Sequence, residues 1–426
     1  MKKFWFIVYN LFGIPLIWLF FKLYSVFNSK VRQGLKERRG LFNDLSRSLS
    51  HLKNNKTVII HSSSLGEYQQ AIPLADEFTK KNYNVVISFF SPSGFNNAKI
   101  ISDNVIKTYI PLDSISNQKK FLDLINPNIL IFMRYDLWYN ILNESGKRGI
   151  KRVLANARYD ENDSTWSIPV ISSFKKNLYG MIDTAFVIDD FDEKNYSEKL
   201  KDENTKIVKI GDSKFERVLQ SVKINSNTED VIPPSVINGR KVFVMGSAWK
   251  DDEDIILPAL DKSLSFEKDL LTVLVPHEPK ETKISAIEKI ISQKYENLRY
   301  IRLSDIGKFN GENLIIVDRI GILSKLYGIA YLSYVGGGFK TGLHNILEPA
   351  IFNMPILFSN KIKNSDEDEI LIEKGCGIVI KDTKQFYRVF REFLTNKELR
   401  DETGEKCRLV FENSSGIAEK IVNQIT

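Results

Sequence analysis

The sequence contains few residues that form disulfides or bind transition metals. Among its 426 residues are two cysteines, Cys376 and Cys407, which excludes the disulfide framework of small secreted domains. The four histidines are widely spread, and no pair has the spacing of a metal site on a helix. We therefore expect a protein of the reducing cytoplasm with no structural or catalytic zinc.

The sequence also lacks a basic excess outside its amino-terminal segment. The formal net charge is +7, and the first 40 residues alone contain eight Lys or Arg side chains against one Glu. The remaining chain is formally neutral, whereas a nucleic-acid-binding domain usually carries a basic stripe on its folded surface. Nucleic acid is therefore not an expected partner.

The amino-terminal segment combines an apolar run with a basic one. The run Phe4–Phe21 is about long enough to cross a bilayer core, although Asn10, Gly13 and Pro15 weaken it, and the basic run Lys22–Arg39 follows directly. No small-residue cleavage site follows, so we expect a membrane anchor whose basic end stays in the cytoplasm. A helix that spans the bilayer, one that lies in its interface and one that packs on a soluble body all remain open.

The rest of the chain alternates short apolar β-rich runs with helix-length segments. Nearly continuous apolar runs are typical of parallel strands that are buried on both faces. The polar segment 220–240, which contains Pro233-Pro234, separates two such series. The first series comprises residues 57–63, 84–90, 105–111, 128–134, 151–157, 184–189 and 207–212. The second comprises residues 241–247, 270–276, 298–303, 313–318, 331–338, 355–359 and 377–380.

Two consecutive βα series predict an α/β protein with two doubly wound Rossmann-like domains that face a central cleft. We place an anchor and basic segment at residues 1–40, one domain at 41–225 and the other at 226–426. The last helix is a candidate to cross back to the first domain. Open α/β sheets bind ligands beyond the carboxyl ends of their strands, so each domain can hold one substrate.

The first motif with chemical potential is His61-Ser-Ser-Ser-Leu-Gly-Glu67, at the end of a predicted strand. Ser64 and Glu67 have capping-box spacing, so Glu67 could simply fix the start of a helix. In the functional interpretation, Gly66 allows close approach of a ligand. The Glu67 carboxylate then accepts a proton from an attacking hydroxyl.

The second motif, residues 336–349, runs Gly-Gly-Gly-Phe-Lys-Thr-Gly-Leu-His-Asn-Ile-Leu-Glu-Pro. A helix is expected to start at His344 or Asn345, and backbone N–H groups at such a start can hold a phosphate. Glu348 could then accept hydrogen bonds from ribose hydroxyls. The alternative is a tight turn without a ligand.

These motifs together resemble the family of 3-deoxy-D-manno-octulosonic acid (Kdo) transferases, which move Kdo from CMP-Kdo to a lipid A precursor. HSSSLGE is similar to the family's segment that ends in the catalytic base, which implies that role for Glu67. The segment GGGFKTGLHNILEPA is similar to the family's nucleotide motif. That likeness implies CMP binding by Asn345, Ile346, Leu347 and Glu348.

Four further segments carry the resemblance along the chain. NARYDENDSTW and GDSKFERV match two of them, and the second implies that Lys214 stabilises the transition state. Lys214 could instead be a solvated residue in the first turn of a helix. VPHEP and DRIGILSKLYGIA are similar to stretches that contact CMP, which implies binding roles for His277, Glu278, Ile320, Gly321 and Ile322.

The sequence departs from the family pattern at three of these positions. Arg134 stands where the family has the first Glu of its METELW segment, and it could meet the Kdo carboxylate or pair with Asp136. Ile322 stands where a Glu is frequent, which leaves it a backbone contact. Glu278 stands where a His is usual.

The resemblance implies an inverting glycosyltransferase of the GT-B type on the cytoplasmic face of the inner membrane. The domain at 41–225 would bind the lipid acceptor and the domain at 226–426 the CMP-sugar, with no metal or other cofactor. Two other functions remain open. One is a GT-B enzyme that uses a UDP-sugar and a lipid acceptor, and the other is a non-catalytic, membrane-tethered protein that binds a nucleotide sugar.

Overall fold

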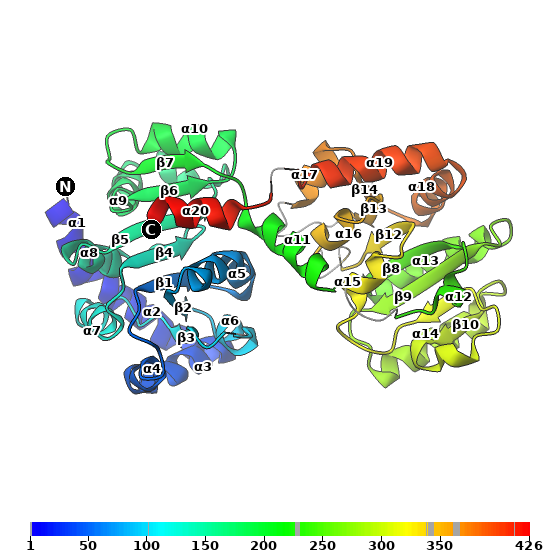
Figure 1. Cartoon of the computed structure of the whole chain (residues 1–426), viewed down its shortest axis with the longest axis horizontal. Helices are drawn as coiled ribbons and strands as arrows, with labels where there is room; N and C mark the ends of the chain where they lie inside the picture. Colours follow the sequence, from blue (N-terminus) through cyan, green and yellow to red (C-terminus); the bar gives the residue numbers. More distant parts are fainter. Residues whose placement is uncertain are drawn as a thin grey trace. The chain divides into compact units, whose positions relative to one another are not determined.

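The computed structural model describes residues 2–100, 102–225, 231–337, 339, 345–360, 367–412 and 414–426. The chain divides into two compact units (Figure 1). Unit 1 comprises Met1–Arg217 and Gly416–Thr426, and unit 2 comprises Val218–Ser415. Each unit is built on one seven-stranded sheet whose strand pairs are all parallel.

The sheet of unit 1 has the order β3-β2-β1-β4-β5-β6-β7. Its inner strands are buried along their whole length, as their apolar sequences require. Every predicted strand of the first series is present. The strands are β1 (Thr57–Ser62), β2 (Asn84–Phe89), β3 (Val105–Tyr109), β4 (Ile129–Met133), β5 (Lys151–Ala157), β6 (Thr184–Val187) and β7 (Lys206–Lys209).

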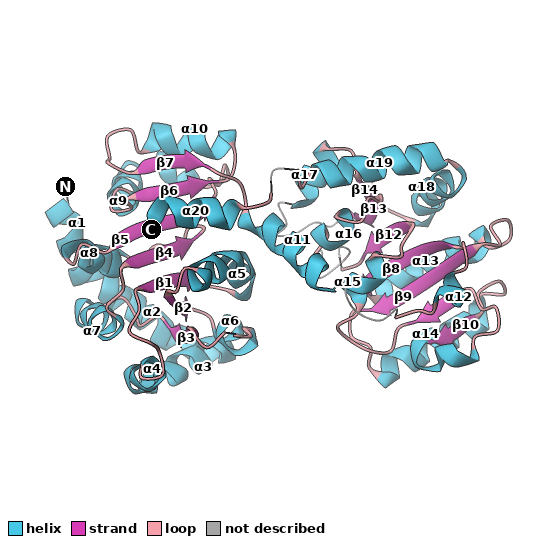
Figure 2. Cartoon of the chain, in the orientation of Figure 1, coloured by secondary structure: helices cyan, strands magenta, loops and turns pink. Residues whose placement is uncertain are grey.

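Helices surround this sheet (Figure 2). They are α4 (Leu41–Leu49), α5 (Leu65–Lys80), α6 (Pro92–Asn97), α7 (Ile115–Ile125), α8 (Tyr139–Lys147), α9 (Pro169–Tyr179), α10 (Asp190–Lys199), α11 (Ser213–Asn225) and α20 (Ile417–Ile425). The last of these, α20, returns to unit 1, where Ile421 is buried in the core. The Glu216 carboxylate accepts the N–H groups of Gly416 (3.2 Å) and Ala418 (2.8 Å), which caps α20.

The predicted apolar helix at the amino terminus is present. It comprises α1 (Lys2–Val8), one π-helical turn at Tyr9–Gly13 and α2 (Ile14–Phe27), and α3 (Ser29–Glu37) follows. Residues Lys3–Phe27 are long and apolar enough to cross a membrane, and 6% of the most apolar window is buried.

The sheet of unit 2 has the order β10-β11-β9-β8-β12-β13-β14. Every predicted strand of the second series is present: β8 (Lys241–Ala248), β9 (Leu270–Pro276), β10 (Tyr300–Arg302), β11 (Leu314–Ile316), β12 (Leu332–Val335), β13 (Ile356–Ser359) and β14 (Gly377–Ile380). Its helices are α12 (Pro234–Ile237), α13 (Lys250–Ser263), α14 (Glu281–Lys294), α15 (Leu323–Tyr327), α16 (Leu347–Ala350), α17 (Glu367–Glu373), α18 (Thr383–Thr395) and α19 (Lys397–Leu409). Both cysteines are free and buried in this unit.

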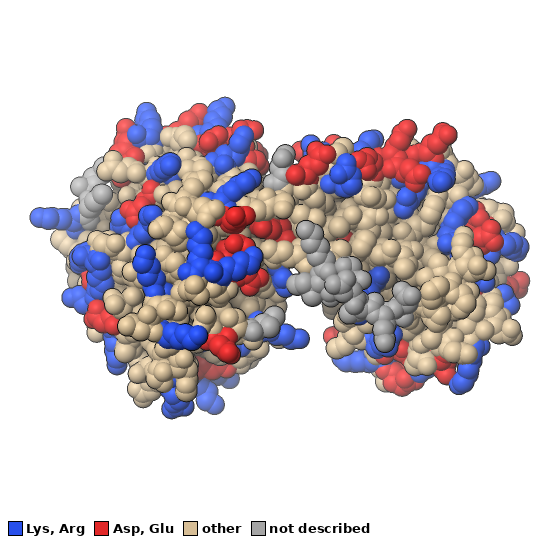
Figure 3. All heavy atoms as spheres, viewed as in Figure 1, with Lys and Arg blue, Asp and Glu red and all other residues tan. Residues whose placement is uncertain are grey.

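The order of the strands locates the ligand-binding edge of each sheet. In unit 1 the chain reverses direction across the sheet between β1 and β4, and in unit 2 between β8 and β12. Such a switch point opens a crevice at the carboxyl ends of the strands. On the face in view, acidic and basic side chains are interspersed over both units (Figure 3). The switch points therefore define where to look for a site.

Candidate active site

Glu67 lies at the switch point of unit 1, in the first turn of α5. Ser64 is the N-cap of this helix, and its Oγ accepts the Glu67 N–H (3.3 Å). The Glu67 carboxylate in turn accepts the N–H of Ser63. One half of the capping box that the spacing predicted is formed, whereas the Glu67 carboxylate binds the N–H of Ser63 instead of that of Ser64; together these contacts fix the orientation of the carboxylate.

Glu67 is more deeply buried than a residue that only caps a helix on the protein surface. The side chain is 7% exposed. Burial raises its pKa, and the nearby Asp136 carboxylate raises it further, while Ser63 and His61 lower it. A carboxylate with a raised pKa holds an accepted proton more strongly, which suits a general base. Glu67 is thus positioned by its cap and tuned by its burial.

His61 connects the ends of three neighbouring strands. Its ring is 1% exposed. Nε2 lies 3.1 Å from Asp136 Oδ2, just after β4, and Nδ1 lies 2.9 Å from Ser88 Oγ on β2. Sequence reasoning missed this triad, although His61 lies near the end of β1, Asp136 follows β4, and these two strands are adjacent. The triad holds Asp136 close enough to influence Glu67.

Arg134 follows β4 in an unusual backbone conformation. Its φ is +63°, in the left-handed region that arginine rarely adopts, and its N–H donates to Ala155 O (2.8 Å). The Arg134 charge lowers the pKa of Asp212, so the guanidinium lies near the start of α11. Asp136 Oδ2 lies within hydrogen-bond distance of His61 Nε2. The roles considered for Arg134 stay predictions.

Asp212 is the centre of a buried polar network at the start of α11. Its Oδ1 accepts Asn156 Nδ2 and the Lys214 N–H, both at 2.7 Å. Asn156 Nδ2 also donates to Gln70 Oε1 on α5 (3.1 Å). Burial raises the pKa of Asp212, and the Lys214 N–H and then the charges of Arg134, Lys214 and Arg158 lower it.

Three cations therefore lie close enough to one buried carboxylate in unit 1 to lower its pKa. Arg134, Arg158 and Lys214 come from the ends of β4 and β5 and from the start of α11. Such a cluster can stabilise negative charge on a ligand in a site that excludes water. Asn156, Arg158 and Asp212 were not predicted as site residues, although they lie within the matched segments NARYDENDSTW and GDSKFERV.

In unit 2, Asp252 on α13 joins the two loops at the switch point. This side chain is fully buried. It accepts the N–H groups of Trp249 (2.9 Å) and Gly337 (3.0 Å) and the hydroxyl of Tyr334 (2.7 Å). The loops after β8 and β12 are therefore held together.

The glycine loop after β12 is shaped by close packing. A Cβ on Gly336 would lie 2.5 Å from Ser247 O, and Gly337 has a φ of +97°. The N–H groups of both residues donate to protein acceptors, Gly246 O and Asp252. These two N–H groups are therefore occupied, and the loop glycines serve close approach between strands.

His277 lies at the end of β9, stacked on Trp249 with ring centroids 4.5 Å apart. Burial lowers the pKa of His277. Lys283 lies beside the same aromatic pair: its Nζ donates to Ala248 O (3.0 Å) and lies 5.5 Å from the centroid of the Trp249 ring. The Glu278 carboxylate is exposed and pairs with Lys280 (2.7 Å).

The remaining predicted residues of unit 2 lie around two short helices. Ile320 is 80% exposed, Gly321 has a φ of +85°, and Ile322 is the N-cap of α15. A single exposed apolar residue is common on protein surfaces, so the binding roles of these three residues stay predictions.

The HNxxEP part of the glycine motif begins its helix slightly later than predicted. α16 starts at Leu347, because Asn345 Oδ1 accepts the Leu347 N–H (3.2 Å) in a local turn. His344 lies outside the described residues. Asn345 Nδ2 also donates to Glu348 Oε1 (3.0 Å), and burial raises the pKa of Glu348. Ile346 and Leu347 are buried beneath this pair.

Both the first half of the chain and the chain as a whole are similar to known proteins. Residues 33–217 match the family model described as 3-deoxy-D-manno-octulosonic-acid transferase (kdotransferase). The chain is 27% identical over 422 residues to the 3-deoxy-D-manno-octulosonic acid transferase of Haemophilus influenzae, which covers 96% of this chain and 94% of the relative. Identity is 28% to the corresponding transferase of Rickettsia bellii, over 87% of this chain and 88% of that one.

A bifunctional glycosyltransferase/methyltransferase of Fusobacterium nucleatum is 28% identical over 92% of this chain, which spans 61% of that relative's length. Two solved structures share the fold. They are the UDP-GlcNAc 2-epimerase of Neisseria meningitidis (TM-score 0.58, 13% identity, 87% of this chain and 99% of that one) and MurG of Acinetobacter baumannii (0.54, 12%, 87% and 99%).

Two parallel seven-stranded α/β units place this protein in the GT-B class, which confirms the predicted fold class. Within that class the chain is similar to the Kdo transferases: residues 33–217 match their family model, and two such transferases are 27% and 28% identical to it over most of its length, as its motifs indicated.

Proposed function

We propose that this protein transfers Kdo from CMP-Kdo to a sugar hydroxyl of a lipid A precursor, with inversion at the anomeric carbon. Unit 2 binds CMP-Kdo, and unit 1 binds the acceptor and supplies the base. The protein acts at the cytoplasmic face of the inner membrane. The observation that carries the proposal is the buried, capped Glu67 at the switch point of unit 1, in a chain whose first half matches the Kdo transferase family model.

The chemistry follows from these groups. Glu67 accepts the proton of the acceptor hydroxyl as that oxygen attacks the anomeric carbon of Kdo. The new C–O bond forms while the bond from the anomeric carbon to the CMP phosphate oxygen breaks, and CMP departs with the electron pair. Lys214 stabilises the charge that develops on this phosphate, and Arg134 meets the carboxylate of Kdo. His277, Asn345 and Glu348 hold the CMP portion.

The direct test is incubation of the purified full-length protein with CMP-Kdo and lipid A precursor, followed by mass spectrometry of the lipid. A mass increase of one or more Kdo units supports the proposal and gives their number. A lipid that is modified only when a UDP-sugar replaces CMP-Kdo would contradict the donor assignment. Binding of CMP without transfer under all conditions would contradict the catalytic assignment.

The stacked pair of Trp249 and His277 provides a test of the donor site. Trp249→Leu removes the aromatic support of His277, and an aromatic pair contributes about 0.5–1.5 kcal/mol beyond its buried area. We expect the Kd for CMP to rise roughly 3- to 10-fold, measured by titration calorimetry. Unchanged affinity would remove His277 from the site. Glu278→Ala in the same titration tests Glu278, whose exposed ion pair with Lys280 predicts less than a twofold change.

A further inference from the structure

The amino-terminal helix contacts unit 1 near both of its ends. At one end, Trp5 Nε1 donates to Ser173 Oγ on α9 (3.1 Å), and its indole packs edge-on against Phe174. At the other end, the ring of Phe21 lies 5.4 Å from that of Phe90, which follows β2. At 1.5 Å per residue these two contacts are about 24 Å apart along the helix. The helix therefore runs along the body of unit 1.

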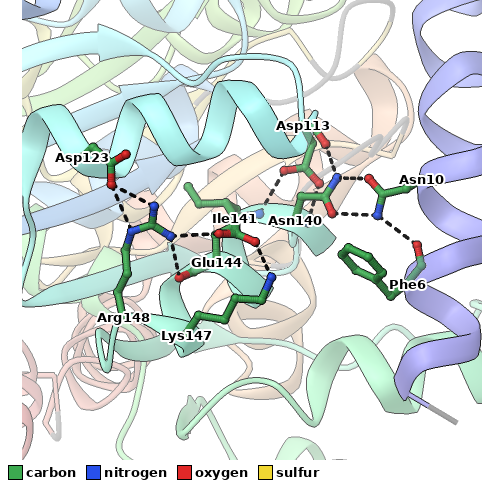
Figure 4. Close-up of polar contacts among 9 residues, drawn as sticks. All are labelled: Phe6, Asn10, Asp113, Asp123, Asn140, Ile141, Glu144, Lys147 and Arg148. Carbon is green, nitrogen blue, oxygen red and sulfur yellow. Dashed lines mark hydrogen bonds and ion pairs between the residues drawn. The ribbon is translucent and has the colours of Figure 1, made fainter.

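Polar contacts join the middle of the helix to unit 1 (Figure 4). The side-chain amides of Asn10 and Asn140 donate to each other's oxygen, at 3.0 and 2.8 Å. The neighbouring Tyr9 hydroxyl donates to Asp113 Oδ2 (2.9 Å). The π-helical turn at Tyr9–Gly13 is where these contacts occur. Asn10 interrupts the apolar run of the sequence, and its side-chain amide thus finds its hydrogen-bond partners within the protein.

These partners belong to the framework of unit 1. Asn140 is fully buried in α8, and the Asp113 carboxylate accepts the N–H groups of Asn140 (2.8 Å) and Ile141 (3.1 Å) at the start of that helix. Release of the amino-terminal helix would leave the Asn140 amide and the Asp113 carboxylate without these partners. Loss of partners at buried polar groups is costly, so the docked position is favoured.

The face of the helix that points away from unit 1 is apolar and exposed. We call it the outer face, and its side chains are between 46% and 86% exposed: Phe4, Ile7, Leu11, Phe12, Leu16, Leu19, Phe20, Leu23 and Phe27. Basic side chains lie at its end, where Lys22 Nζ sits 4.6 Å from the Trp18 ring centroid. An apolar surface edged by cations complements the acyl chains and anionic headgroups of a bilayer.

We propose that Lys3–Phe27 lies along the membrane surface with its outer face in the bilayer interface, and that it does not cross the membrane. A crossing helix would carry one end to the far side of a hydrocarbon core about 30 Å thick. Unit 1 contacts the helix at Trp5, Asn10 and Phe21, so a crossing would require loss of at least one of these contacts. The docked helix also keeps unit 1 directly at the lipid surface, independently of the reaction that the protein catalyses.

Single cysteines test this topology in the full-length protein. Lys3→Cys and Ser29→Cys place a thiol at each end of the helix, and Lys201→Cys reports the side on which unit 1 lies; all three positions are exposed. The native Cys376 and Cys407 are buried, so the unsubstituted chain gives the background. The reagent is a membrane-impermeant maleimide, applied to inverted vesicles and to spheroplasts.

All three cysteines are expected to react in the same preparation. Reaction of Lys3→Cys only in the preparation where Lys201→Cys is silent would overturn the proposal. A nitroxide scan over residues 11–20 gives a second, independent readout. An interfacial helix gives a depth that oscillates every 3.6 residues within roughly 5–10 Å of the boundary. A depth that passes through one broad maximum at the middle of the helix would also overturn it.

Discussion

Glu67→Gln is expected to lower kcat by at least about 10²–10⁴-fold, the contribution of a positioned general base. Glutamine keeps an oxygen that can accept the Ser63 N–H, so the cap of α5 survives while the proton acceptor is lost. Steady-state kinetics with CMP-Kdo and lipid A precursor measure the effect. Near-normal turnover would reduce Glu67 to a capping residue.

The pH dependence provides a sharper form of the same test. Because burial raises the pKa of Glu67, the wild-type kcat should fall as the pH drops through a value above the ordinary 4.5. This acid limb should be absent from the residual activity of Glu67→Gln. An identical limb in both proteins would assign it to another group.

The raised pKa of Glu67 also predicts how the stability of Glu67→Gln compares with that of the wild type. A carboxyl whose pKa is higher in the folded state favours folding as the pH falls toward 4.5, and it opposes folding when it is ionised at higher pH. A neutral glutamine removes that penalty, so Glu67→Gln should have a Tm at pH 8 no lower than wild type. Ser64→Ala is the matched control. It loses the hydrogen bond to the Glu67 N–H and should cost about 0.5–2 kcal/mol, yet keep the acid limb.

The strands and the position of Glu67 could be predicted because both depend on local pattern. Apolar runs of strand length define β1 and β4, and the Ser64–Glu67 spacing defines the start of α5. The partners of His61 could not be predicted. They depend on which strands become neighbours and on the exact side-chain directions at the strand ends.

The docking of the amino-terminal helix shows the same limit. Asn10 and Asn140 are 130 residues apart, and nothing near either residue indicates the other. Composition describes the apolar run correctly but cannot distinguish a crossing helix from one that lies on the protein. The left-handed backbone at Arg134 is likewise set by its position between β4 and α8, because arginine itself does not favour it.

The second large effect is expected at Lys214. Lys214→Met keeps the backbone N–H that Asp212 accepts but removes the ammonium group. If Lys214 acts on the phosphate charge that develops during bond breaking, kcat should fall by about 10²–10³-fold with little change in the KM for CMP-Kdo. Lys214→Arg should recover part of this loss. A solvated first-turn lysine would give near-normal values for both constants.

Substitution of Arg134 should change a different kinetic constant from substitution of Lys214. The Kdo carboxylate carries its charge before and during the reaction, so a contact with Arg134 stabilises the ground state and transition state alike. Arg134→Met should therefore raise the KM for CMP-Kdo by more than it lowers kcat. If Arg134 only balances the charge of Asp212, the variant should lose stability while kcat and KM stay near wild type, since burial already raises the pKa of Asp212.

The double variant Arg134→Met/Lys214→Met then shows whether the two cations act on one ligand. Free-energy losses that add indicate separate groups, and a loss smaller than the sum indicates one shared charge.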